Sequence, residues 1–121
     1  MNEKTIRMSN GRPVSIDLEN WTTWAAATDY DHTKHPHDLQ SYSSLHVYKR
    51  GGQEKYLVFG KSYSCYDGGN TTYAGILVTD ENELTDAMHQ VVDDLGLVGE
   101  DRADPDLLRK WEQDLPAVDL D

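Results

Sequence analysis

Residues 41–64, SYSSLHVYKRGGQEKYLVFGKSYS, decide the fold, because two apolar runs flank a glycine pair. Adjacent glycines readily adopt the positive φ angles of a tight hairpin turn. With the glycine pair as a two-residue turn, Val47 would lie opposite Tyr56, and Leu45 would lie opposite Val58. Side chains that alternate in this way place their apolar members on one face. The stretch therefore predicts a central β-hairpin with one apolar face.

Further strands are expected on both sides of this hairpin. Asn10-Gly11 lies between the short runs 4–8 and 13–18, and an Asn-Gly pair indicates a second tight hairpin. Residues 71–79, TTYAGILVT, predict another strand. The segment WTTWAAATDY, residues 21–30, fits a helical turn or a buried strand, because so short an apolar run does not define its own period.

The C-terminal third predicts two amphipathic helices. From about 80 to 95, apolar residues recur with the spacing of one helix face. They are Leu84, Ala87, Met88, Val91, Val92 and Leu95. Thr79 or Asp80 can cap this helix, and Gly96 suits the position after its last turn. A second helix is expected to start at Asp104, with Pro105 at its first position, and to stop before Pro116.

The length of 121 residues is most simply one domain, mainly β over residues 1–79 and helical over 80–121. We expect an α+β fold in which a small antiparallel sheet of three to five strands packs with two C-terminal helices. Cys65 is the single cysteine, so no internal disulfide can form. No segment has the apolar length of a signal peptide core or a membrane span. These features predict a soluble protein in the cytoplasm of a bacterial host.

The net charge of −11 belongs to one end of the sequence. Residues 1–79 carry eight acidic and eight basic side chains, whereas residues 80–121 carry fourteen acidic and three basic ones. On the first predicted helix the carboxylates lie outside the apolar face, and neighbours three or four positions apart are about 5–6 Å from each other. This spacing approximates that of phosphates along a nucleic-acid strand. We expect a partner-binding surface formed by Asp80, Glu81, Glu83, Asp86, Asp93, Asp94, Asp101, Asp104 and Asp106.

A solvated helix face that keeps the protein soluble is the common alternative for such a charge run. However, like charges three or four positions apart cost a helix about 0.2–0.5 kcal/mol per pair, so the clustering does not favour folding. A basic nucleic-acid-binding protein, such as a CRISPR effector or a nuclease, would recognise this surface in a salt-sensitive way. Direct nucleic-acid binding is disfavoured, because it requires clustered Lys and Arg. This hypothesis requires no catalytic residue and no cofactor.

A histidine-rich stretch, DYDHTKHPHD at residues 29–38, supports an alternative function. His32, His35 and His37 could bind a metal ion together with a nearby aspartate, since zinc accepts both donor types. Their spacing matches no helix-borne motif such as H-E-x-x-H, and a solvated polar loop is the more common case. The alternative function is a metal-binding module or a metal-dependent enzyme.

A third hypothesis retains the protein partner but places the contact on the sheet instead of on the acidic helices. Tyr42, His46, Tyr48 and Phe59 share the second face of the central hairpin, and aromatic side chains are enriched at protein interfaces. Cys65 could act as a nucleophile, but no cysteine-enzyme signature surrounds it. A small apolar filler is the more common role of such a residue.

Three segments carry a resemblance to known proteins. MSNGRPVSIDLENW (8–21), YLVFGKS (56–62) and AGILV (74–78), followed by an acidic amphipathic helix, resemble a group of small proteins borne on proteobacterial phages and plasmids. The resemblance covers most of residues 8–97 and implies no catalytic residue. By size and one-sided acidity the chain is also similar, as a class, to phage anti-CRISPR and anti-restriction proteins and to nuclease immunity proteins. That similarity implies a non-catalytic inhibitor.

Overall fold

Six strands form two antiparallel sheets in the computed structural model, which describes residues 3–30, 42–64, 70–96 and 107–116. The strands are β1 (Glu3–Arg7), β2 (Pro13–Asp17), β3 (Trp21–Tyr30), β4 (Tyr42–Arg50), β5 (Tyr56–Ser64) and β6 (Asn70–Val78). A short 3₁₀ turn, η1 (Glu81–Glu83), leads into α1 (Leu84–Asp94), and α2 (Leu107–Gln113) follows. The expected α+β class, with an antiparallel sheet and two C-terminal helices, is confirmed.

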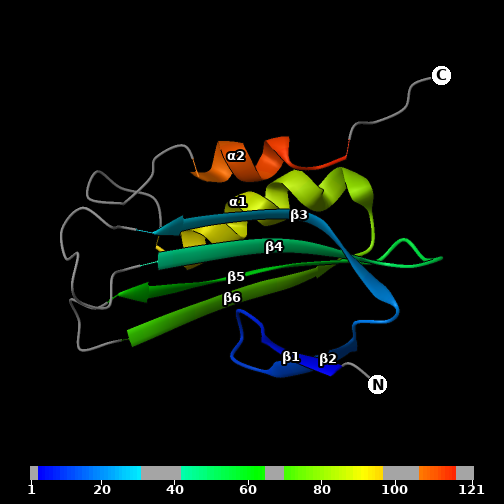
Figure 1. Cartoon of the computed structure of the whole chain (residues 1–121), viewed down its shortest axis with the longest axis horizontal. Helices are drawn as coiled ribbons and strands as arrows, with labels where there is room; N and C mark the ends of the chain where they lie inside the picture. The colour runs from blue at the N-terminus through cyan, green and yellow to red at the C-terminus, as the bar shows by residue number, and fades with distance from the viewer. Residues whose placement is uncertain (1–2, 31–41, 65–69, 97–106, 117–121) are drawn as a thin grey trace.

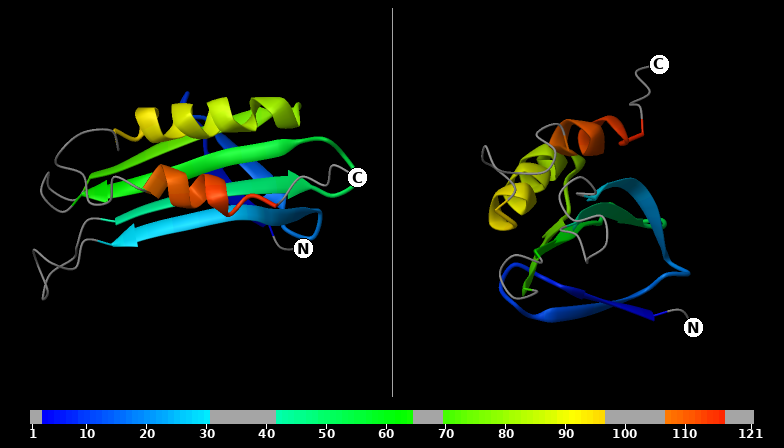
Figure 2. Two further views of the ribbon diagram at one scale, coloured as in Figure 1. Left: turned by 90° about the horizontal axis from the view of Figure 1, so that it is seen from above. Right: turned by 60° about the vertical axis from the view of Figure 1, so that its left-hand side comes forward.

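The elements form three layers (Figures 1 and 2). Strands β3-β4-β5-β6 make the central sheet in sequence order, and both helices lie on one of its faces. Helix α1 packs against β5 and β6, whereas α2 packs against the edge strand β3. The β1–β2 hairpin covers the opposite face of the sheet. The sheet is therefore buried from both sides.

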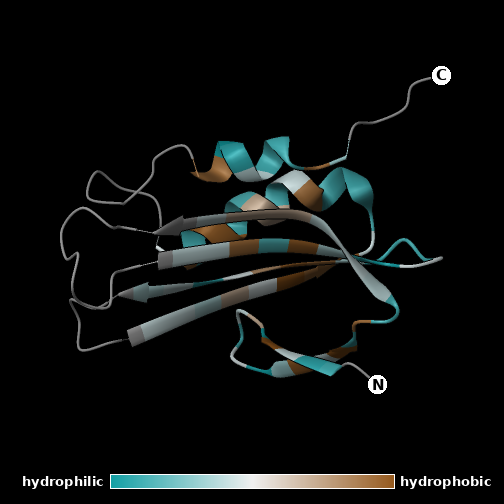
Figure 3. Cartoon of the chain, in the orientation of Figure 1, coloured by the Kyte–Doolittle hydropathy of each residue, from teal (hydrophilic) through white to brown (hydrophobic). Residues whose placement is uncertain are grey.

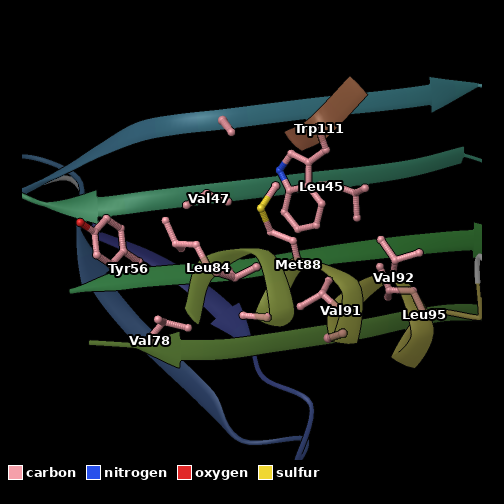
Figure 4. Close-up of a cluster of buried hydrophobic side chains, with 14 of the residues drawn as sticks. Leu45, Val47, Tyr56, Val78, Leu84, Met88, Val91, Val92, Leu95 and Trp111 are labelled. Carbon is pink, nitrogen blue, oxygen red and sulfur yellow. The ribbon is translucent and has the colours of Figure 1, made fainter. Parts of the chain in front are cut away.

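The main core lies between the helices and the sheet (Figure 4). Leu45 and Val58 from the central strands, Met88 and Val91 from α1, and Trp111 from α2 are fully buried there. The predicted apolar face of α1 is confirmed, since Leu84, Ala87, Met88, Val91 and Val92 are all buried. Figure 3 shows the same segregation as alternating hydrophobic and hydrophilic turns along α1. Burial of each large side chain contributes about 1.5–3 kcal/mol.

A second core lies between the central sheet and the β1–β2 hairpin. Ile6 and Ile16 from the hairpin pack against Tyr48, Leu57 and Phe59 of the sheet. The aromatic face proposed as a contact surface is therefore covered, with Tyr48 9% exposed and Phe59 7% exposed. That hypothesis is wrong for these two rings, because an N-terminal hairpin predicted as a separate element lies on top of them.

The ambiguous segment 21–30 is a strand with a β-bulge. The pairing of β3 with β4 shifts between Thr23 and Ala25, which leaves Trp24 as the extra residue. Trp24 then faces the helical layer, where its ring meets Tyr56 at 5.2 Å. Trp21 packs instead into the core beneath the hairpin. Residues three positions apart in a strand already lie on opposite faces, so the bulge is not what separates the two tryptophans. Its effect is that Trp24 and its neighbour Ala25 both pack against the helical layer.

The register of the central hairpin differs by two residues from the prediction. Val47 lies opposite Val58, and Leu45 lies opposite Gly60. The two strands are joined by four residues rather than two, since the Arg50 N–H donates to the Lys55 carbonyl at 3.0 Å. Only the second glycine of the pair has a positive φ, whereas the tight type I′ turn needs both. Because the shift is even, every side chain stays on its predicted face.

The C-terminal end of α1 is as predicted, because Gly96 follows the helix with a φ of 70°. The start differs, since the expected first turn is η1, which Asp80 caps by accepting a hydrogen bond from the Asn82 N–H at 3.0 Å. Helix α1 itself begins at Leu84, and no side chain among the described residues caps it. Helix α2 lies within the predicted range, although Asp104 and Pro105 fall outside the described residues. None of the described helices is long and apolar enough to cross a membrane.

Candidate functional site

The predicted acidic surface lies on the outer side of η1 and α1. From residue 80 to residue 94 the chain has six carboxylates and no Lys or Arg. Asp86 and Asp93 are exposed and point away from the buried residues Met88 and Val91. They are seven positions apart, which corresponds to about 10.5 Å along the helix axis. Among the described residues, neither carboxylate has a hydrogen-bond or ion-pair partner.

Several of the other predicted carboxylates hold the fold together. Asp80 caps η1, as described above. Asp94 accepts hydrogen bonds from the Ser9 hydroxyl at 3.0 Å and from the Gln90 amide at 2.8 Å. Asp114, which follows α2 and was not in the predicted set, accepts from the Ala26 N–H of the edge strand β3 at 2.8 Å. A structural role therefore accounts for part of the acidity that the sequence suggested was functional.

The carboxylates do not form an unbroken row along α1. Asp86 and Asp93 are separated by His89 and Gln90, and His89 Nε2 lies 2.6 Å from Glu112 Oε1 on α2. The acidic surface is thus split into two groups at the two ends of the helix. The first group is Asp80, Glu81, Glu83 and Asp86, and the second is Asp93 and Asp94. Asp101, Asp104 and Asp106 lie outside the described residues.

A basic cleft on the opposite layer was not predicted from the sequence. It has a volume of about 390 Å³ and lies between β1 and the face of the sheet that the hairpin covers. Lys4 and Arg7 of β1 and Lys61 of β5 line it, and no Asp or Glu in the described part of the chain does. These cations were overlooked because they belong to the half of the sequence whose net charge is zero.

Aromatic rings form the floor and one wall of this cleft. His46 stacks on Phe59, with ring centroids 4.9 Å apart and planes 20° from parallel. Lys4 Nζ lies 5.6 Å from the centroid of Phe59 and donates a hydrogen bond to the Tyr48 hydroxyl at 3.3 Å. Arg7 places its guanidinium 5.7 Å from the centroid of Tyr73. Cation–π contacts of this kind hold long basic side chains in place.

Ser44 and His46 form the closest side-chain contact in the cleft. Ser44 Oγ lies 2.6 Å from His46 Nε2, which is the distance expected of a serine nucleophile and its base. Burial, together with the charges of Lys4 and Lys61, lowers the pKa of His46 from 6.5 to about 4. Such an imidazole is a weak base at neutral pH, and no carboxylate among the described residues stabilises its protonated form. The pair suits hydrogen bonding to a ligand better than nucleophilic catalysis.

The proposed metal ligands His32, His35 and His37 lie outside the described residues, as does Cys65. Within the described ranges, no group of three or more His, Cys, Asp or Glu residues is placed to hold a metal ion. The metal hypothesis concerns the 29–38 stretch, so it stays a prediction.

Comparisons of the chain with protein-family models, curated proteins and solved structures found no match. The resemblance to phage- and plasmid-borne proteins therefore also stays a prediction.

Proposed function

We propose that the protein is a non-catalytic inhibitor, encoded by a phage or another mobile element, that blocks a basic nucleic-acid-binding site on a host defence complex. CRISPR effectors and restriction nucleases are the partners that this chemistry fits. The acidic surface of η1 and α1 would occupy the channel in which the partner normally holds phosphates. The carboxylates would replace phosphate oxygens as acceptors for the partner's Lys and Arg.

The observation that carries this proposal is the state of Asp86 and Asp93. Both are exposed and make no contact that stabilises the fold among the described residues. They share a helix with further carboxylates and with no Lys or Arg to offset them. These carboxylates lower the stability of the helix and make no contact within the fold, so contact with a partner protein is the role that best accounts for them.

The split of the acidic surface into two groups changes how it would mimic the phosphates of a nucleic acid. Two acidic groups about 10 Å apart, one at each end of α1, would contact two separate basic patches rather than a continuous track of phosphates. Such a field speeds association and is screened within a Debye length of about 8–10 Å at moderate salt. Binding should therefore weaken steeply as salt is raised.

The test compares the wild type with the Asp86→Lys/Asp93→Lys variant. Asp94 is left intact, because its bonds to Ser9 and Gln90 contribute to folding. The matched control is Glu3→Lys/Glu19→Lys, which makes the same change in net charge at exposed positions on the hairpin side. Each protein is immobilised and incubated with nuclease-treated lysate of a proteobacterial host, and retained proteins are identified by mass spectrometry.

We expect the wild type and the control to retain a nucleic-acid-binding complex that added double-stranded DNA displaces. The Asp86→Lys/Asp93→Lys variant should fold normally by circular dichroism and retain none of it. The purified complex should then lose DNA binding when wild-type protein is added. Equal retention by the lysine variant, or retention that DNA does not compete with, would show that the acidic surface is not the inhibitor's contact.

A further inference from the structure

Strand β6 forms an outer edge of the central sheet, and its own sequence does not protect it against strand pairing. It pairs with β5 on one side, and no strand among the described residues adds to its other side. Residues 70–79, NTTYAGILVT, contain no charged side chain and no proline, which are residues that natural edge strands use against pairing. An edge of this kind is a template on which another strand can add.

The turn of the N-terminal hairpin covers the middle of this edge (Figure 1). The Ser9 N–H donates to the Gly75 carbonyl at 3.1 Å, and the Ser9 hydroxyl accepts from the Gly75 N–H at 3.1 Å. A residue of an added antiparallel strand would satisfy the same two backbone groups. Gly75 permits this close approach, because a Cβ there would lie 2.8 Å from Met8 Sδ. Ser9 thus takes the position of one residue of a partner strand.

The edge is open on both sides of this contact. Alternate residues of an antiparallel strand point their N–H and C=O groups to the same side, so Tyr73 and Leu77 share the outward direction of Gly75. In the described part of the chain, neither residue has a backbone partner on that side. The Arg7 guanidinium lies over the Tyr73 ring, whereas Leu77 is 53% exposed. Burial of this leucine would favour association with another strand.

The sequence around Gly75 is complementary to itself. If two β6 strands pair in antiparallel fashion about a two-fold axis at Gly75, each Tyr73 lies opposite the Leu77 of the other copy. Cross-strand pairs of large apolar side chains are favourable, and no like charges meet within residues 70–79. A closed two-fold dimer also covers both open edges at once. A second copy of the chain is therefore the partner that this edge fits.

We propose that the β6 edge is a dimerisation surface for a second copy of this chain, and that the hairpin turn is a removable cap that keeps it closed. Ser9 and the second copy compete for Gly75, so pairing requires the turn to withdraw. The Ser9 hydroxyl also donates to Asp94 on α1 at 3.0 Å, which anchors the cap. Because each copy has a net charge of −11, salt should strengthen the pairing. Salt should weaken the binding of a basic partner to the acidic surface, so the two proposals are distinguishable.

The test is Ser9→Pro in the full chain. Ser9 is the second residue of the turn that the Gly11 N–H closes on the Met8 carbonyl, and proline is favoured at that position. Proline there removes both groups that bind Gly75 and retains the turn. By sedimentation equilibrium, the association constant should exceed that of the wild type by about tenfold or more. In the dimer, the Tyr73 and Leu77 amides should exchange their hydrogens more slowly.

A second change in the Ser9→Pro protein locates the contact. Leu77→Lys should return self-association to the wild-type level, because it places a charge in the paired edge. Leu18→Lys is the matched control, since Leu18 is also an exposed leucine, at 38%, and lies outside β6. It makes the same change in net charge and should leave the dimer intact.

Asp94→Ala weakens the cap without changing the turn. It removes the anchor of Ser9 and should raise self-association less than Ser9→Pro does, whereas Asp93→Ala, an equal change in charge, should not raise it. The proposal is overturned if folded Ser9→Pro associates no more than the wild type, or if Leu18→Lys disrupts the dimer as Leu77→Lys does. If Ser9→Pro does not fold, equal self-association of Asp94→Ala and Asp93→Ala overturns it.

Discussion

Gly60 has no side chain because the helix-facing side of the sheet leaves no room for one. A Cβ at this position would lie 2.7 Å from Leu45 Cδ2 and 2.8 Å from the Ser44 carbonyl oxygen. Leu45 occupies the space opposite Gly60 in the β4–β5 pair, so the glycine is what allows a leucine on the neighbouring strand. The backbone contact cannot be relieved by turning a side chain.

We therefore expect Gly60→Ala to lower the free energy of unfolding by about 1–3 kcal/mol, the usual effect of overpacking a core. Urea denaturation measures the change. Gly51→Ala is the matched control, because its nearest neighbour would be the Asn20 carbonyl oxygen at 3.5 Å, which is an ordinary contact. A Gly60→Ala protein as stable as this control would mean that the neighbouring strands can shift enough to accommodate the added methyl group.

His46 predicts a pH dependence of stability. Its pKa is lowered by burial, and by Lys4 and Lys61, from 6.5 to about 4 in the folded protein. Below pH 6.5 the unfolded chain binds a proton that the folded chain does not, so acid favours unfolding. The free energy of unfolding should fall between pH 6.5 and about pH 4. The loss is about 1–3 kcal/mol, because solvent screens a partly exposed imidazole.

The measurement compares urea unfolding of the wild type and His46→Gln across this pH range. The two proteins differ only at this residue, so the difference between the two curves isolates His46. The wild type should lose more stability on acidification than His46→Gln does. Parallel curves would mean that His46 is as easily protonated in the folded protein as in the unfolded one.

At the scale of elements, Ser9 joins the N-terminal hairpin to the other two layers. Its hydroxyl donates to Asp94 on α1 at 3.0 Å and accepts from the Gly75 N–H of β6 at 3.1 Å. The Ser9 N–H in turn donates to the Gly75 carbonyl at 3.1 Å. Ser9, a single residue in a turn, thus connects the β1–β2 hairpin with strand β6 and with helix α1.

Ser9→Ala should lower the free energy of unfolding by about 1–2 kcal/mol, because it leaves the part-buried Gly75 N–H without its acceptor. Asp94→Ala should have a smaller effect, and the double variant should lose less than both single changes combined. Urea denaturation of the four proteins gives this coupling. Ser15→Ala, at an exposed position on β2, should be neutral, and an equal loss there would refute a specific role for Ser9.

The elements predicted correctly are those set by local sequence. Asn10-Gly11 defines the first hairpin, and the apolar period of residues 84–95 defines α1. The register of β4 and β5 was not predictable from the glycine pair, because the loop between them contacts a distant turn. Gly51 N–H donates to the Asn20 carbonyl at 2.7 Å, a partner thirty-one positions away. The bulge at Trp24 likewise depends on packing against the helical layer, where both Trp24 and Ala25 lie.

At the scale of the whole molecule, exposed acidic and basic side chains gather on opposite sides of the central sheet. The helical layer carries the uncompensated carboxylates Asp86 and Asp93, and the hairpin side carries the cleft lined by Lys4 and Lys61. The acidic side could be predicted, because its charges are consecutive in the sequence. The basic side could not, because its cations are more than fifty positions apart and are brought together only when β1 crosses the sheet.

The long reach of the N-terminal hairpin has a consequence for biosynthesis. Ser9 and its partner Asp94 are 85 positions apart, so the hairpin leaves the ribosome well before the helix it binds. At the usual rates of translation this gap corresponds to about 4–17 s. A two-stranded hairpin alone is marginally stable in water, and its apolar residues Ile6 and Ile16 have nothing to pack against until the sheet around Phe59 has been made. During that interval the hairpin is available to chaperones, which bind exposed apolar strands.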